Sequence, residues 1–160
     1  MAETFVHLRV HSEYSMVDGL VRVKPLVSRV AELGMPAVGL TEQSNMCSLV
    51  RFYKAALGAG VKPIIGADLW LENPDEPDNP FRLTLLARNG DGYLNLTEIV
   101  SLGYTDGQRF GKPIIEKRWL EARREGLIAL SGAKLGDVGK ALLAGKEELD
   151  RERAAYGRDL

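Results

Sequence analysis

Short apolar segments alternate with longer amphipathic segments along this chain, and this alternation restricts its fold more than any other feature. Apolar runs with the length of strands lie at 5–13, 36–42, 61–71, 81–88 and 127–132. Apolar residues at helical spacing predict helices over 20–34, 44–60, 91–104, 137–145 and 147–160. Strands that alternate with helices are typical of parallel βα units, so we expect an α/β fold with mostly parallel strands.

The number of strands limits the architecture further. About five strands are too few to close an eight-stranded barrel of ~250 residues. A chain of 160 residues is therefore either a small open α/β domain or the first part of something larger, and we favour the second. In both cases we expect one domain over residues 1–160.

Composition excludes several classes of protein. The formal net charge of −1 argues against a dedicated nucleic-acid-binding protein, which usually carries a basic excess. The single Cys47 excludes an intrachain disulfide and fits a reducing compartment. The N-terminus lacks the layout of a secretion signal, and no apolar run approaches the roughly 18 residues that span a bilayer. We expect a soluble, cytoplasmic protein without a membrane partner.

Polar residues gather where the predicted strands end, which is where α/β folds place their functional groups. On the first strand, His7, Arg9 and His11 share one face because side chains alternate. By the same rule Glu42 and Gln43 point to opposite faces. The other candidates are Asp18, Asp68, Arg82, Ser131 and Ala133.

A metal site is one interpretation of these residues. His11, Asp18 and Asp68 are ligand types for zinc or manganese. Two arginines would share the cavity, however, and a guanidinium cannot lose its proton to become a ligand. From spacing alone we prefer a hydrogen-bonded core histidine, with the aspartates as caps or arginine partners.

Other patterns carry weaker signals. No glycine-rich phosphate loop is present, and Ser131 has no neighbouring base, so we expect it in a turn or cap. Cys47 has apolar neighbours at a predicted helix start and is expected to be a small buried residue rather than a nucleophile. The basic residues between 109 and 124 alternate with glutamates, which favours a solvated face over a DNA track.

Four blocks occur in order: HLRVHSEYSMVDG, GMPAVGLTEQSNMCSLVRFYKAALGAGVKPIIGAD, RLTLLARNGDGYLNL and EGLIALSGAKLGDVGKAL. Together they resemble the N-terminal polymerase-and-histidinol-phosphatase (PHP) domain of bacterial DNA polymerase III alpha subunits, over essentially the whole chain. The resemblance implies the N-terminal portion of a distorted (βα)7 barrel with mostly parallel strands. The polymerase active site would lie far downstream, outside this chain.

The resemblance also implies a degenerate metal site. Where metal-binding members of the family carry ligands, this chain keeps His11 and Asp18 and has Glu42 for the Asp of Thr-Asp-His; His7 precedes the ligand pair and is not counted. The replacements are Arg9 for the first His, Gln43 for the His of Thr-Asp-His, Asp68 for a Glu, Arg82 for a later His and Ala133 for a Cys. Two cations, an amide and a methyl group chelate a transition metal poorly. The resemblance therefore implies no hydrolase chemistry and no cofactor here, while the parent polymerase would use Mg²⁺ elsewhere.

These replacements suggest an ion-pair cluster. Without metals, Asp18 and Asp68 would be unpaired anions in a partly buried cavity, and Arg9 and Arg82 return positive charge to about the same place. We expect the four residues to hold strands together; in a variant of this hypothesis, the two arginines bind phosphate or pyrophosphate.

Three functions remain open. The resemblance implies a non-catalytic scaffold within a DNA-replicating nucleotidyltransferase, whose partners are the rest of the polymerase chain and the proofreading exonuclease subunit, with DNA contacted only through the parent polymerase. The alternatives are a metal-dependent phosphoesterase or pyrophosphatase with residual activity, and a stand-alone α/β binding protein.

Overall fold

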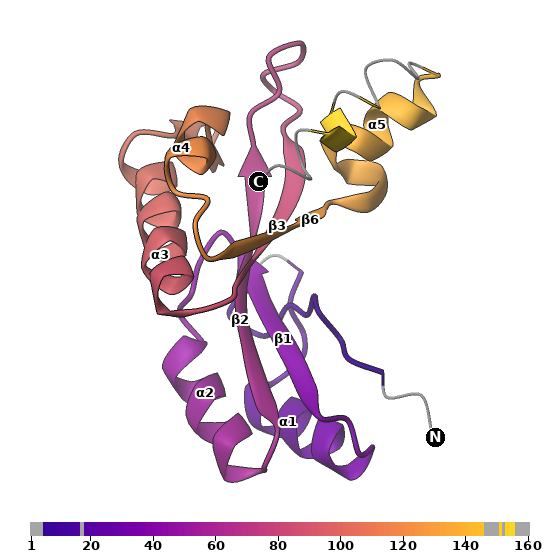
Figure 1. The fold of residues 1–160 in the computed structure, drawn as a ribbon, viewed down its shortest axis with the longest axis vertical. Coiled ribbons are helices and arrows are strands. Elements are labelled where there is room, and N and C mark those ends of the chain that lie inside the picture. The colour runs from indigo at the N-terminus through magenta and orange to yellow at the C-terminus, as the bar shows by residue number, and fades with distance from the viewer. Residues whose placement is uncertain (1–4, 17, 146–150, 152, 156–160) are drawn as a thin grey trace. The chain divides into compact units, whose positions relative to one another are not determined.

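The structure, a computed structural model, describes residues 5–16, 18–145, 151 and 153–155 (Figure 1). The chain forms two compact units, of which the first ends at Ala67 and the second begins at Asp68. The boundary lies inside one strand, β2 (Lys62–Leu71). One domain over residues 1–160 stays a prediction.

The first unit contains α1 (Val23–Glu32), β1 (Ala37–Gln43), α2 (Leu49–Gly58) and the start of β2. β1 pairs with β2. Both helices are shorter than predicted. In the segment before α2, Ser44 has a positive φ of 53° and Asn45 Oδ1 accepts the N–H of Cys47 at 3.0 Å, so this segment is a loop. The core is formed by Val23, Val27, Val30, Val38, Leu40, Phe52, Ala56 and Val61.

The predicted strand over 5–13 is not formed as a regular strand. Only isolated bridges occur there, which pair His7 with Val38 and Ser12 with Val21. The N–H of Gly39 donates to His7 O at 2.6 Å, so the segment does lie beside β1. The prediction was right about the extended conformation and wrong about a continuous ladder.

The second unit contains the end of β2 and the elements that follow it in the chain. These are β3 (Phe81–Ala87), α3 (Gly90–Thr105), β4 (Gln108–Arg109), β5 (Lys112–Ile115), α4 (Lys117–Ala122), β6 (Leu127–Ser131), the 3₁₀ helix η1 (Ala133–Leu135) and α5 (Asp137–Leu143). The strand order is β4-β5-β2-β3-β6. Apolar side chains from β2, β3, β5 and α3 are buried, among them Leu69, Leu85, Ile115 and Ile99.

The expectation of mostly parallel strands is wrong, and the (βα)7 barrel is not confirmed. β3 pairs antiparallel with β6, and β4 pairs antiparallel with β5, whereas β2 and β5 are parallel. The physical reason lies in the connections. β4 and β5 are joined by the two-residue turn Phe110-Gly111, whose φ angles of 53° and 73° suit a tight antiparallel hairpin. A parallel pair needs a crossover of a dozen or more residues.

The C-terminal helix predicted over 147–160 lies largely outside the described residues. Within the part of the chain that the structure describes, no helix is both long enough and apolar enough to cross a membrane.

Candidate functional site

His11 and Asp18, the two retained ligand-type residues, contact each other in the first unit. His11 Nδ1 lies 2.9 Å from Asp18 Oδ1, and the histidine side chain is only 10% exposed. The turn that brings them together requires Gly19, because a Cβ there would lie 1.7 Å from Ser12 O. The DG pair of the sequence thus has a structural role: its aspartate orients the histidine ring and its glycine lets the chain close.

Among the described residues of the first unit, Glu42 is the most enclosed charged residue, with 1% of its surface exposed. Its Oε2 accepts the N–H of Ser12 at 3.0 Å and the hydroxyl of Ser15 at 2.5 Å. Its Oε1 accepts the hydroxyl of Ser48 at 2.8 Å and that of Ser12 through a short hydrogen bond. We call Glu42 with Ser12, Ser15 and Ser48 the serine cluster.

The serine cluster connects three segments of the first unit. Ser12 and Ser15 belong to the N-terminal segment, Glu42 to β1, and Ser48 is the residue before α2. Ser15 Oγ also accepts the N–H of the neighbouring Gln43 at 2.8 Å. Sequence reasoning missed all three serines. The only available signal was a buried glutamate at the end of an apolar strand, which requires hydrogen-bond donors around it.

Asp68 has the corresponding position in the second unit, where its side chain is fully buried. Arg82 Nη1 donates to Asp68 Oδ2 at 3.0 Å, and the hydroxyl of Thr84 donates to Oδ1 at 2.8 Å. Arg82 and Thr84 are two residues apart on β3, so both side chains reach the same face. The Arg82–Asp68 pair is one of the contacts that the ion-pair cluster requires.

The Trp70 ring contacts Arg82 of this pair and one further cation, Lys112. The guanidinium carbon of Arg82 lies 3.9 Å from the centroid of the Trp70 ring, and Lys112 Nζ lies 4.7 Å from it. Such cation–π contacts are worth about 0.5–2 kcal/mol, more when they are desolvated. The Nε of Arg82 is buried without a hydrogen-bond partner among the described residues. Stacking on Trp70 therefore helps to hold the Arg82 side chain in place.

The four-residue ion-pair cluster stays a prediction. Arg9 and Asp18 belong to the first unit, while Arg82 and Asp68 belong to the second. The partner that the structure gives Asp18 is His11 rather than a guanidinium.

The other candidates contribute little chemistry. Ser131 ends β6, and Ala133 begins η1 with a positive φ of 46° and an exposed methyl group. Cys47 is exposed, so the expected buried position is wrong; it precedes α2 in a loop rather than in the helix. On the surface, Arg109 and Arg118 both pair with Glu116.

A small pocket of about 120 Å³ lies in the second unit, lined in part by Glu76, Phe81 and Lys140. Lys140 Nζ donates to Asn79 Oδ1 at 2.9 Å and lies 5.1 Å from the centroid of the Phe81 ring. Burial lowers the pKa of Lys140 from its ordinary value of 10.5, and the nearby Glu76 opposes this shift. These contacts hold α5 against the 72–80 loop.

Several residues that the resemblance places at metal-ligand positions are poor ligands. Arg9 and Arg82 are cations, Ala133 has no donor atom, and Gln43 offers a weak amide ligand. Among residues 5–16, 18–145, 151 and 153–155, no group of three or more His, Cys, Asp or Glu side chains is arranged to hold a metal. We therefore derive no metal-dependent step.

The chain is similar to known proteins in sequence and in fold. The family model described as "PHP domain" matches residues 7–158. The DNA polymerase III subunit alpha of Pseudomonas aeruginosa is 61% identical over 147 residues, which are 92% of this chain and 12% of that protein. That of Escherichia coli K12 is 50% identical over 152 residues, 95% of this chain and 13% of that protein. Among solved structures, an amidohydrolase from Chromobacterium violaceum with bound sulfate and no metal aligns with 59% of this chain and 32% of its own, at a TM-score of 0.45 and 18% identity.

The chain therefore spans 12–13% of the length of these two relatives, while nearly all of it aligns with them.

Proposed function

We propose that this chain, which belongs to the PHP domain family, is the N-terminal part of a bacterial DNA polymerase III alpha subunit. In this role it is a non-catalytic scaffold of a cytoplasmic, DNA-replicating nucleotidyltransferase. It braces the rest of the polymerase chain and provides a docking surface for the proofreading exonuclease subunit. DNA and Mg²⁺ are bound by the parent polymerase outside this chain.

The observation that carries the scaffold role is the Arg82–Asp68 pair. A PHP hydrolase needs ions to activate water and to hold a phosphate. Here a guanidinium occupies one family ligand position and binds the carboxylate at another, at 3.0 Å with the aspartate fully buried. A cation beside that carboxylate opposes metal binding by charge repulsion and by using the donor electrons of Asp68.

The serine cluster supports the same role in the first unit. Glu42 stands at a third family ligand position, and its carboxylate oxygens accept hydrogen bonds from Ser12, Ser15 and Ser48. A carboxylate satisfied in this way holds its strand to neighbouring segments and has little remaining capacity to coordinate an ion. The polar residues of the former site thus contribute to cohesion.

Primer extension by the full-length protein tests the identity. The full-length protein should extend a primed DNA template with Mg²⁺, and should co-sediment with the exonuclease subunit. A full-length protein that synthesises no DNA would refute the assignment to a polymerase.

A phosphoesterase assay of the same full-length protein tests the scaffold role. With Mn²⁺ and a chromogenic phosphoester, wild-type protein and its His11→Ala variant should show the same background rate. Turnover that His11→Ala abolishes would favour the residual phosphoesterase instead, because His11 is the imidazole retained from the ligand set.

A further inference from the structure

Helix α2 carries apolar side chains on two faces. Phe52 and Ala56 are buried in the core of the first unit. Val50, Tyr53 and Leu57 are 64%, 48% and 56% exposed. Their i, i+3, i+7 spacing places these three residues along one side of the helix. We call Val50, Tyr53 and Leu57 the outer stripe of α2.

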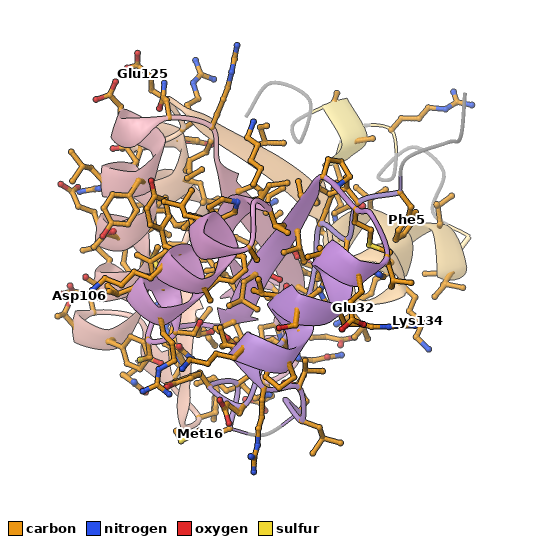
Figure 2. All side chains as sticks on the ribbon, turned by 90° about the horizontal axis from the view of Figure 1, so that it is seen from below. Phe5, Met16, Glu32, Asp106, Glu125 and Lys134 are labelled. Carbon is orange, nitrogen blue, oxygen red and sulfur yellow. The ribbon has the colours of Figure 1, made fainter. Side chains whose placement is uncertain are left out.

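Helix α1 of the same unit has the opposite pattern. Its apolar face is buried through Val23, Val27 and Val30. Its exposed face carries Lys24, Ser28, Arg29 and Glu32, and Figure 2 labels Glu32 on this helix. A polar outer face is typical of a surface helix, whereas apolar residues on both faces are typical of a helix that is covered on both sides. Within one unit, the outer face of α1 is therefore suited to solvent, and the outer face of α2 is suited to contact with another segment.

The charges of α2 indicate the chemistry of the covering segment. Arg51 and Lys54 are the charged residues of Leu49–Gly58, and the helix contains no acid. Both are exposed, and the helical periodicity places both along the same edge of the outer stripe. A segment that packs on this stripe would bind best with apolar residues in its centre and carboxylates at its edge.

We propose that in the full-length protein the outer stripe of α2 is covered by an apolar, acid-flanked segment of the same polypeptide from outside residues 1–160. This inference rests on the proposed function. Three roughly half-exposed side chains provide far less than the ~800 Å² per partner that a standard stable complex buries. A covalently attached segment needs less area, because attachment raises its effective concentration to about the millimolar range. The relatives are long enough to contain such a segment, since this chain spans 12–13% of their length.

Cysteine accessibility in the full-length protein tests this proposal. In a Cys47→Ser background, Leu57→Cys probes the outer stripe, and Ser28→Cys is the matched control on the exposed face of α1. Peptide mass spectrometry measures the rate of alkylation by N-ethylmaleimide at each cysteine. Each rate is divided by the rate of the same cysteine in the urea-unfolded protein. We expect Leu57→Cys to react at least ~10-fold more slowly than Ser28→Cys, as a site does that must open locally before it reacts. Equal relative rates would overturn the proposal, and so would protection that disappears on dilution, because it would assign the stripe to a second copy of the chain.

A charge reversal tests the acid-flanked part. Arg51→Glu with Lys54→Glu should raise the alkylation rate of Leu57→Cys several-fold at low salt, whereas Lys24→Glu with Arg29→Glu should not. An unchanged rate would overturn the assignment of acidic flanks.

Primer extension by the same preparations separates this inference from the proposed function. DNA synthesis with a freely reactive stripe would refute the inference alone. A protected stripe in a protein without polymerase activity would refute the proposed function alone.

Discussion

Replacing Glu42 by alanine removes the acceptor that the serine cluster shares. The carboxylate accepts four hydrogen bonds from Ser12, Ser15 and Ser48. Glu42 is only 1% exposed. Each buried donor left unsatisfied costs about 1–3 kcal/mol. Hydroxyl groups can rotate to other acceptors, so we take the lower end and expect Glu42→Ala to lower the free energy of unfolding by ~4 kcal/mol. The total free energy of unfolding of a typical domain is only about 5–15 kcal/mol.

Urea unfolding followed by far-UV circular dichroism measures this loss. Glu42→Gln keeps one acceptor oxygen and should lose less than Glu42→Ala. Glu32→Ala is the control, because Glu32 is exposed on α1 and its side chain pairs with Arg29 at the surface; we expect a change within ~0.5 kcal/mol. If Glu42→Ala is as stable as Glu32→Ala, the serine cluster does not hold the first unit together.

Two further predictions concern the second unit. Arg82→Ala leaves Asp68 buried without its cation and should lower the free energy of unfolding by about 3–5 kcal/mol in urea titrations; a loss no greater than that of the exposed Arg88→Ala would contradict this. Lys140 has a lowered pKa in the folded state, so the unfolded state binds more protons and the stability contributed by Lys140 should rise as pH rises toward 10.5. Between neutral pH and pH 10.5, the urea midpoint of the wild-type protein should therefore rise relative to that of Lys140→Met. If the difference between the two midpoints stays constant with pH, the lowered pKa of Lys140 is contradicted.

Much of the fold follows from local sequence patterns. Apolar runs predicted β1, β2, β3 and β6 to within about two residues. In β1 and β3 most residues are buried, and burial on both faces selects continuous apolar residues. Strand direction did not follow, since pairing depends on connections between distant residues. The β4–β5 hairpin was missed because Phe110, unlike the usual Asn or Gly, holds a positive φ in its turn.

The candidate site was predictable in its residue types and less so in its contacts. The resemblance led us to expect Arg82 and Asp68 within a four-residue ion-pair cluster, and the structure places these two 3.0 Å apart while the cluster stays a prediction. Asp18 was expected either as a cap or as an arginine partner, and the contact that the structure gives it is with His11. The serine cluster was not predicted, because serines are common and only the fold shows that Ser12, Ser15 and Ser48 surround one carboxylate. Hydrogen-bond donors of this kind are identified by burial of the acceptor, which sequence periodicity does not report.

The metal content of the protein tests the proposal that polar contacts, at His11 in the first unit and at Asp68 in the second, have replaced metal coordination. Full-length protein purified without chelators would be analysed for zinc, manganese and iron beside its His11→Ala and Asp68→Asn variants. We expect no stoichiometric ion that depends on these two residues. One equivalent of a transition metal per chain, bound by the wild type and lost in both variants, would contradict it.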